Sequence, residues 1–454
     1  MDKWDAIVIG GGVSGLTAGA LLANAGRRVL LLEKESKVGG RASASEYRGQ
    51  IVDNGIHGLL SMGYMEEIYR RLGKPFPEYV VYDEGADVFS DGEWRSFGET
   101  FMTKDFRQIL KSDILSQPYE ALEKYQSMSV KDWLSERTDD KAIHEYFAFM
   151  AWAILGGHRY EDMAASRLLE ILKEVREKRG HLAGLGAINF RGGLSTLTGP
   201  LAEAIKERGG QIRTDANVAN VVVKEGVARG VEIESGNPLF VSQFHDSQFV
   251  EADMVVATVP IWSLFSVVPE GHFPRWYVDW IKGISPRKCL IMTLVCGMDE
   301  LLWKEWKCIR FVSHLPRTGL GGLLMFAPTY AERVGEYQAW FWLQIHWDEV
   351  PPLFSQHRAR RRLALRHTFD SFEADIQEVL PGFQQHCLWK IRHHDYFGLA
   401  EAPAVVGAFR PSIKPPGIEN FYLVSDTLSS GRSTGMESCA SLALQLVDEV
   451  LAST

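Results

Sequence analysis

The chain has few cysteines and none of the spacings that usually give cysteine a structural or redox role. The 454 residues contain five cysteines, an odd number, and no CxxC pair. This argues against a disulfide framework, a zinc ribbon and a dithiol redox pair. A reducing compartment, the cytoplasm, is therefore the expected location. The 13 histidines show no ligand spacing supported by acids, so no metal site is expected.

The sequence also lacks a long hydrophobic run and an excess of positive charge. The longest apolar run, around residues 254–268, is broken by Pro260 and by hydroxyl residues. It is shorter than the ~20 residues that a spanning helix needs. No basic segment precedes the first apolar run, so a signal peptide is not expected. The 49 basic and 58 acidic residues give a net charge of −9, which argues against a protein that follows nucleic-acid phosphates.

Glycine is abundant, with 42 residues, and the first of them form a recognisable motif. The pattern predicts a strand over 5–9, a glycine turn over 10–15, a helix over 16–25 and a buried strand over 28–33. In the turn, Gly10 permits the tight bend, Gly12 lets the backbone approach a pyrophosphate, and Gly15 lets the helix pack closely. Glu33, at the end of the second strand, would accept hydrogen bonds from ribose hydroxyls. The sequence therefore predicts a dinucleotide site.

The rest of the chain alternates between two kinds of pattern. A helical, aromatic-rich stretch covers 76–189, and short strands follow a helix predicted over 195–208. Further strands are expected within 289–346, a basic helix over 356–380, and a strand, loop and helix in the last 40 residues. This predicts two domains, each built from separate segments. They are a nucleotide-binding domain of 1–75, 190–265 and 410–454, and a substrate-binding domain of 76–189 and 266–409.

Several motifs, in order along nearly the whole chain, carry a family resemblance. They are Val38-Gly39-Gly40-Arg41, Asp53-Asn54-Gly55-Ile56-His57, Arg191-Gly192-Gly193 through Leu197, Gly210 through Val231, and Asn420 through Asp426 with Gly435-Met436-Glu437. Together they resemble the flavin-containing amine oxidase and phytoene desaturase superfamily, and most closely its phytoene desaturase branch. The family usually has Gly where Ser425 stands.

The resemblance implies the fold and the cofactor. The expected fold is α/β, with a Rossmann-type FAD-binding domain of glutathione reductase-like, amine oxidase topology interleaved with a mixed-sheet and helical substrate domain. FAD is expected to bind non-covalently, because no Ser-Gly-Gly-Cys-type attachment segment precedes Cys439. By the same resemblance, Arg41 approaches the FAD phosphates, the Val218 backbone contacts adenine, and the turn at Met436 opens a helix aimed at the flavin. The expected FAD-binding residues are Gly10, Gly12, Val13, Ser14, Gly15, Glu33, Lys34, Gly39, Gly40, Arg41, Gly55, Ile56, His57, Val218, Asp426, Gly435 and Met436.

Four residues are candidates for the chemistry: Lys288, His57, His394 and Tyr396. Lys288 is similar in context to the lysine that amine oxidases hold near flavin N5 through a water. A surface lysine entering a strand is the alternative interpretation. His57 belongs to the segment that runs beside the isoalloxazine in the family. His394 is interpreted as a proton carrier and Tyr396 as an aromatic wall, with a histidine pair at a strand edge as the alternative.

Two further groups of residues, the tryptophan pairs and an arginine cluster, each allow two interpretations. Three tryptophan pairs fit an aromatic-walled pocket for an apolar substrate, or core packing; they are Trp276 and Trp280, Trp303 and Trp306, and Trp340 and Trp342. An arginine cluster fits a peripheral contact with anionic lipid, or a solvated helix face; it comprises Arg358, Arg360, Arg361, Arg362 and Arg366.

The sequence thus predicts an FAD-dependent oxidoreductase that passes a hydride from an apolar small molecule to flavin N5. Desaturase- or isomerase-type chemistry at a carbon–carbon bond is preferred. The alternative is a flavin amine oxidase using O2, which is weakened because Gly435 stands where amine oxidases tend to place an aromatic residue. A third possibility is a non-catalytic protein on the scaffold of the Rab escort proteins. The intact glycine turn, Glu33, Arg41 and Asp426 argue against it.

Overall fold

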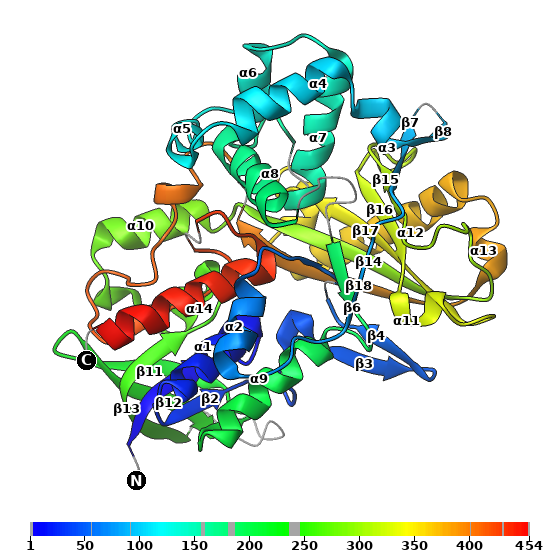
Figure 1. Ribbon diagram of the computed structural model, residues 1–454. Helices are drawn as coiled ribbons and strands as arrows, with labels where there is room; N and C mark the ends of the chain where they lie inside the picture. Colours follow the sequence, from blue (N-terminus) through cyan, green and yellow to red (C-terminus); the bar gives the residue numbers. More distant parts are fainter. Residues whose placement is uncertain are drawn as a thin grey trace.

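The computed structural model describes residues 3–55, 57–90, 92–155, 159–179, 187–235, 246–399, 401–428 and 431–452. It is a mixed α/β molecule with two large sheets and a group of helices above them in the view of Figure 1. Ile56, one of the predicted FAD-binding residues, lies outside the described residues. The expected fold class is confirmed.

The first sheet begins with the predicted βαβ unit. Strand β1 (Trp4–Ile9) and strand β2 (Val29–Leu32) pair in parallel, and helix α1 (Val13–Asn24) connects them. All four residues of β2 are buried, as expected for a parallel strand covered on both faces. Helix α1 starts three residues before the predicted start, because Gly12 serves as its N-cap.

The seven described strands of this sheet come from distant parts of the chain. Strand β13 (Asp246–Ala257) is long because one part pairs in parallel with β1 and another pairs antiparallel with β12 (Val227–Ser235). The other members are β10 (Gln211–Arg213), β11 (Val218–Lys224) and β19 (Phe421–Leu423). Helices α9 (Ser195–Glu207) and α14 (Gly435–Ala452) pack against α1.

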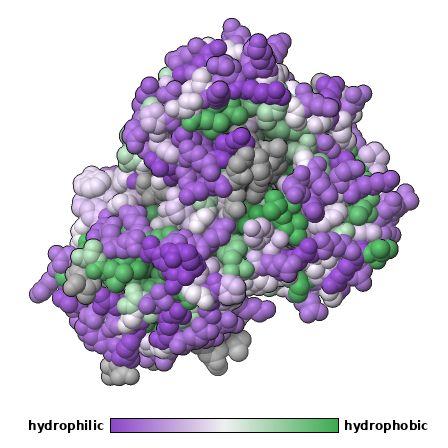
Figure 2. Space-filling model, in the orientation of Figure 1, coloured by the Kyte–Doolittle hydropathy of each residue, from purple (hydrophilic) through white to green (hydrophobic). Residues whose placement is uncertain are grey.

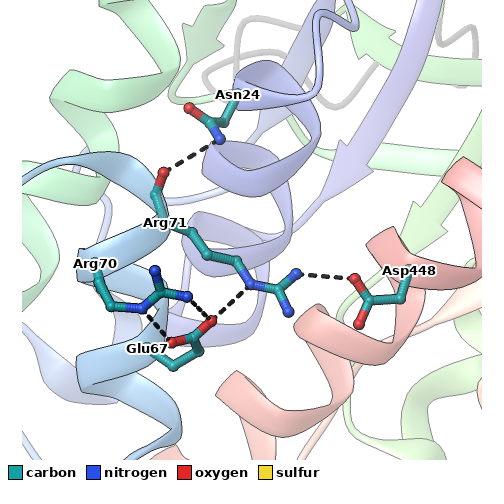
Figure 3. Close-up of polar contacts among 5 residues, drawn as sticks. All are labelled: Asn24, Glu67, Arg70, Arg71 and Asp448. Carbon is teal, nitrogen blue, oxygen red and sulfur yellow. Dashed lines mark hydrogen bonds and ion pairs between the residues drawn. The ribbon is translucent and has the colours of Figure 1, made fainter.

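Helix α2 (Tyr64–Leu72) is tied to both α1 and α14 (Figure 3). The Arg71 guanidinium lies 2.9 Å from Glu67 Oε1 in its own helix and 2.8 Å from Asp448 Oδ1 of α14. The Asn24 side-chain amide of α1 donates to the Arg71 carbonyl at 3.4 Å. These contacts are exposed, so they orient the helices more than they stabilise the fold.

The second sheet is mostly antiparallel and lies across the molecule from the first (Figure 1). Its strand order is β18 (Cys387–Leu399), β14 (Lys288–Met298), β17 (Tyr337–Ile345), β16 (Gly322–Phe326), β15 (Ile309–Val312), β7 (Ala86–Ser90) and β8 (Glu93–Ser96). Alternate residues serve two cores. Val295 and Trp340 face the helical group, whereas Leu294 and Phe341 face helix α12 (Arg358–Val379).

The helical group above this sheet accounts for the aromatic-rich stretch. Its members are α3 (Phe97–Phe101), α4 (Lys104–Ile109), the π-helical η2 (Leu110–Leu115), α5 (Tyr119–Glu123), α6 (Val130–Ser135), α7 (Lys141–Leu155) and α8 (Ala165–Arg179). Smaller elements complete the described fold: β3 (Ala44–Tyr47), β4 (Gln50–Asp53), β5 (Leu59–Leu60), β6 (Tyr79–Val81), β9 (Ala187–Phe190), η1 (Gly40–Ala42), η4 (Ile261–Ser266), η5 (Glu270–His272), α10 (Arg275–Ile284), α11 (Pro328–Ala331), η6 (Pro351–Phe354), α13 (Phe383–His386) and η7 (Gly407–Phe409).

The face shown in Figure 2 is largely hydrophilic, with hydrophobic residues gathered in a few patches. Across the part of the chain that the structure describes, no helix combines the length and the apolar character that a membrane crossing requires. None of the five cysteines, all of which lie in the described residues, forms a disulfide, and four of them are buried. No group of metal-binding side chains occurs among the described residues.

Candidate cofactor and substrate site

A cavity of about 820 Å³ lies between the two sheets. On one side it is lined by the glycine turn after β1, the residues after β2, the start of β11 and the start of α14. On the other side it is lined by α8 and by residues of β14, β17 and β18. The carboxyl ends of β1 and β2 open into it, which is where open α/β sheets bind ligands.

The glycine turn leaves its backbone open toward the cavity. Gly10 has φ of +101°, and a Cβ on Gly15 would lie 1.8 Å from the Gly10 carbonyl oxygen, so both positions require glycine. A Cβ on Gly12 would meet no atom within 4 Å, because that position faces the cavity. The turn at the N-terminus of α1 can therefore receive a phosphate group.

The carboxylate of Glu33 is buried and held in place by backbone groups. Its Oε2 accepts from Gly11 N–H at 2.6 Å and its Oε1 from Glu35 N–H at 2.9 Å. The Glu33 carbonyl accepts from Ala216 N–H at 2.9 Å, which brings Val218 to the same end of the cavity. Each carboxylate oxygen keeps acceptor capacity for ribose hydroxyls.

The Gly39-Gly40-Arg41 segment closes over the glycine turn. Gly39 N–H donates to the Gly11 carbonyl at 2.7 Å. Arg41 Nη2 lies 2.9 Å from Asp426 Oδ2, and its Nε lies 3.5 Å from Asp395 Oδ2. The Asp426 carboxylate raises the pKa of Arg41 above its ordinary value. Arg41 is thus a fixed cation in the cavity wall, suited to a diphosphate.

Asp53, Gly55 and His57 support the site from behind the cavity wall. A Cβ on Gly55 would lie 2.3 Å from the Arg41 carbonyl oxygen, so the two segments are in close contact. Asp53 Oδ1 accepts from Leu194 N–H at 2.8 Å, and its Oδ2 lies 3.4 Å from His57 Nδ1. The His57 ring is buried and stacks on Trp340, with 4.1 Å between centroids.

The start of α14 contributes two residues to the cavity and one to packing. Gly435 and Met436 line the cavity. Glu437 Oε2 accepts from Tyr64 N–H at 2.8 Å and from Met65 N–H at 3.2 Å, so its carboxyl group caps helix α2. Burial raises the pKa of Glu437 to about 7.

Most of the predicted FAD-binding residues line this one cavity: Gly10, Gly12, Val13, Ser14, Glu33, Lys34, Gly39, Gly40, Arg41, Val218, Asp426, Gly435 and Met436. Gly15, Gly55 and His57 lie behind them. The open glycine cradle, the fixed cation and the buried acid fit FAD in an extended form. Cys439 also lines the cavity, and burial raises the pKa of its thiol to about 12. A protonated thiol is a poor nucleophile for covalent attachment.

Strand β18 divides the predicted catalytic residues between two faces. Asp395 lies beside Ile291, which lies beside Gln344, and all three line the cavity. His394 is paired with Met292, which belongs to the opposite core beneath α12. Because neighbouring residues of a strand point to opposite faces, His394 faces away from the cavity. Burial lowers the pKa of the adjacent His393 to about 4, with His394 and His57 adding to the shift.

Lys288 and Tyr396 contact each other. Lys288 Nζ lies 5.2 Å from the centroid of the Tyr396 ring and 5.6 Å from that of Trp262. Burial lowers the pKa of Lys288, and Arg361 adds to the shift. Tyr396 borders the cavity, but its hydroxyl donates to the Leu353 carbonyl and its ring packs on Phe354. Lys288 is not among the described residues that line the cavity.

Sequence reasoning chose His394 over its neighbour Asp395 of β18, and it missed five further charged residues of the cavity wall: Glu35, Glu234, Arg167 of α8, and Glu401 and Arg410 of the segment between β18 and β19. The last three form one buried ion-pair network, although more than 200 residues separate Arg167 from its partners. No spacing motif connects them. Only Asp395 carried a usable signal, because the alternation of β18 fixes which of residues 393–396 share its face.

The predicted aromatic wall of tryptophans is not found, and Tyr396 is the one aromatic residue among the described residues that line the cavity. None of the six tryptophans lines the cavity within the described chain. Trp276 is 61% exposed, Trp303 is buried in the core beneath α12, and Trp340 and Trp342 flank His57. Core packing or surface exposure accounts for these side chains.

Comparison with known proteins identifies the family. The model of the flavin containing amine oxidoreductase family matches residues 13–451. A 4,4'-diapophytoene desaturase of Methylomonas sp. is 24% identical over 337 residues, which is 65% of this chain and 61% of that protein. A phytoene desaturase of Cercospora nicotianae is 37% identical over 344 residues, 65% of this chain and 51% of that protein.

Both of these curated relatives are longer than the region that matches, because the chain spans only 61% of the first and 51% of the second. The fold is also that of a solved structure. Putrescine oxidase bound to putrescine superposes with a TM-score of 0.70, at 16% identity, over 99% of both chains. At this identity the likeness concerns the fold alone.

Proposed function

This chain belongs to the flavin-containing amine oxidoreductase family and is an FAD-dependent oxidoreductase, and from that premise we propose that it oxidises a carbon–carbon bond of an apolar small molecule. The reaction would be of the desaturase type, or an isomerisation that begins in the same way. Bound FAD supplies the hydride acceptor at N5. The protein has to position the substrate, exclude water and receive a proton.

The position of the Lys288 ammonium group is the observation that favours oxidation of a carbon–carbon bond over oxidation of a carbon–nitrogen bond. The alternative, amine oxidation with O2, depends on a lysine that reaches the flavin from this position. Here the ammonium group lies over the rings of Tyr396 and Trp262 instead. Gly435, which lines the cavity without a side chain, also leaves no aromatic cage for an amine at that point. Both observations favour the carbon–carbon bond.

The relatives support the same choice without deciding it. Two of them are named as desaturases of phytoene or diapophytoene, and the match covers only 61% and 51% of the lengths of those relatives. Amine oxidation remains the second candidate, because putrescine oxidase shares the fold over its whole length.

Asp395 is the proposed proton acceptor in place of His394. Its carboxyl group lies in the cavity wall, within 3.5 Å of Arg41. Burial raises the pKa of Asp395, and Arg41 opposes this shift. A carboxylate poised in this way can take up the proton that is lost together with a hydride when a carbon–carbon bond is desaturated.

Anaerobic bleaching of the bound flavin tests the proposal. We expect unsaturated or polyene lipids to reduce the flavin, and primary amines such as putrescine to leave it oxidised. Bleaching by the amines alone would contradict the proposal. A second measurement is the rate of flavin reoxidation by O2 in Lys288→Met. We expect this rate to stay within twofold of that of the unmodified protein, whereas a lysine-assisted oxidase would slow by tenfold or more.

A further inference from the structure

A row of polar side chains continues from Asp395 along the cavity face of the second sheet. His393 stands two residues before Asp395 in β18, so the two side chains share a face and are roughly 6.6 Å apart along the strand. Thr293 of β14 is the direct neighbour of His393, as Ile291 is of Asp395. Asp395 and Ile291 line the cavity. The row therefore begins at the cavity wall and leads away from it.

Each member of this row has a buried polar atom without a hydrogen-bond partner among the described residues. The three atoms are Asp395 Oδ2, His393 Nε2 and the hydroxyl oxygen of Thr293, whose side chain is fully buried. Asp395 Oδ2 lies 3.5 Å from Arg41 Nε, which is an ion-pair contact but too long for a good hydrogen bond. Leaving buried polar groups unpaired costs free energy, so three of them in one row indicate bound water.

The inner side of the row is closed by aromatic rings. Trp342 of β17 is the other neighbour of Thr293, and the centroid of the buried His57 ring lies 5.2 Å from that of Trp342. The two ring nitrogens of His57 also lack hydrogen-bond partners in the described part of the chain, although Asp53 lies 3.4 Å from Nδ1. Because this side is buried, solvent has to reach the row from the side of His393.

His393 connects the row with the surface. Strand β18 is the outer strand of this sheet as described, and His393 is partly exposed although its Nε2 is buried. A neutral imidazole accepts a proton at one ring nitrogen and releases one from the other. Burial lowers the pKa of His393 to about 4 and raises that of Asp395 above its ordinary 3.8. Because the two pKa values approach each other, a proton can pass between the groups at little cost in free energy.

We propose that Asp395, Thr293 and His393 bind a short chain of water, and that this chain carries the proton of the substrate from Asp395 to the surface. The inference rests on the proposed function, in which Asp395 receives that proton. Because the row holds hydrogen-bonding groups of both kinds, donors and acceptors, it can orient water in either direction.

The atoms and electrons of this step balance without a further reactant. Two C–H bonds of the substrate break and a second carbon–carbon bond forms. One hydrogen leaves with two electrons to the bound FAD, and the other leaves as a proton to the Asp395 carboxylate. The new O–H bond then breaks as the proton passes through water to His393 Nε2. His393 releases a proton from its other ring nitrogen to solvent, which restores both residues.

The bound water can be tested without a substrate. A crystal structure of the FAD-loaded protein should show ordered water within hydrogen-bond distance of at least two of the three unpaired atoms. Thr293→Val replaces the hydroxyl by a methyl group of similar size, and the water beside it should disappear. A dry row in the unmodified protein would overturn the proposal, whatever the reaction.

The timing of proton release tests the path. Phytoene in detergent is mixed anaerobically with the FAD-loaded protein in weak buffer, and stopped flow follows flavin bleaching together with a pH-indicator dye. In the unmodified protein, proton release should keep pace with bleaching. In His393→Gln, which keeps a polar side chain but carries no proton, release should lag bleaching by about tenfold or more. Bleaching itself should change by less than about threefold, because Asp395 still accepts the proton, and added imidazole should shorten the lag.

His394→Gln is the matched control, because His394 is adjacent in β18 but belongs to the opposite face of the sheet. It should show no lag. A merely structural role of His393 would slow bleaching and proton release together. That result, release in step with bleaching in His393→Gln, or an equal lag in the control would each overturn the proposal.

Failure of the path and failure of the proposed reaction give different results. If phytoene bleaches the flavin but His393→Gln shows no lag, the reaction stands and the path fails. If phytoene leaves the flavin oxidised and putrescine bleaches it, the proposed reaction fails. Amine oxidation also releases a proton, so a lag of His393→Gln with putrescine would still support the path, and its absence would overturn it.

Discussion

At the scale of single residues, Glu437 shows how a charged side chain can be used for structure in the middle of a cofactor motif. Its Oε2 accepts hydrogen bonds from the backbone N–H groups of Tyr64 and Met65 at the start of α2. Its Oε1 is buried and has no hydrogen-bond partner in the described chain. Such a carboxyl group is favoured in its neutral form when folded. Its protonation should therefore affect the stability of the protein.

The pH dependence of stability tests this role. The pKa of Glu437 is about 7 in the fold against an ordinary 4.5, so its contribution is fully present below pH 4.5 and is lost as the pH rises through 7. The difference corresponds to at most about 3 kcal/mol. Between pH 5 and pH 8, Glu437→Gln should lose less stability than the unmodified protein, as measured by the unfolding of both FAD-loaded proteins in denaturant.

Glu67→Gln serves as the comparison, because Glu67 is a partly exposed, ion-paired acid on the same helix α2. It should reproduce the pH profile of the unmodified protein above pH 5. If Glu437→Gln has that same profile, Glu437 is ionised in the fold throughout this range and the interpretation is wrong.

At the scale of elements, the pairing of β18 with β14 decides which side chains reach the cavity. The register places Asp395 beside Ile291 on the cavity face and His394 beside Met292 on the opposite face. A slip of one residue would exchange the two sets. The roles of two adjacent residues therefore test the arrangement of the strand.

We predict that Asp395→Asn slows anaerobic flavin reduction by a good substrate by at least a hundredfold, because the proton acceptor is removed. His394→Ala should change the rate by less than threefold. Stopped-flow measurement of flavin bleaching, with the flavin content of each variant determined first, gives both values. The reverse order of effects would restore His394 as the proton carrier and exclude Asp395.

Helices and strands were also the features that could best be predicted from the sequence. The βαβ unit could be predicted because its strands are buried on both faces and its glycines have steric requirements, such as the 1.8 Å approach at Gly15. The network of Arg167, Glu401 and Arg410 could not, because its members come together only through the packing of α8 against distant loops. The tryptophans gave no reliable signal, since core packing and ligand contact require the same apolar side chain.

At the scale of the whole molecule, two sheets built from separated segments enclose one cavity. The strands of the first sheet lie within 4–32, 211–257 and 421–423, and those of the second within 86–96 and 288–399. Each set falls inside the segments predicted for one domain, although the boundaries themselves stay a prediction. Because both sheets supply walls of the cavity, we expect neither segment set to bind FAD and substrate alone.

The distribution of charge over the molecule leads to the last prediction. The protein has a net charge of −9, yet the first half of α12 carries five arginines and no acid before Asp370. Leu363, among these arginines, is 68% exposed. Arg361 lies near Lys288 and Tyr396, and Tyr396 borders the cavity. A lipid surface bound here would lie close to the site where an apolar substrate has to enter.

We therefore predict weak binding to vesicles that contain phosphatidylserine and none to phosphatidylcholine vesicles, measured by co-sedimentation at low salt. At about 1 kcal/mol for each basic residue near the surface, reversing Arg358, Arg360 and Arg362 to Glu should abolish it, as should 0.5 M salt. Reversing Arg70, Arg275 and Arg333 changes the net charge equally, but these arginines are exposed elsewhere and already paired with acids. That control should still bind. Equal loss in both variants would mean that net charge alone governs the contact, and no binding at low salt would leave α12 a solvated face.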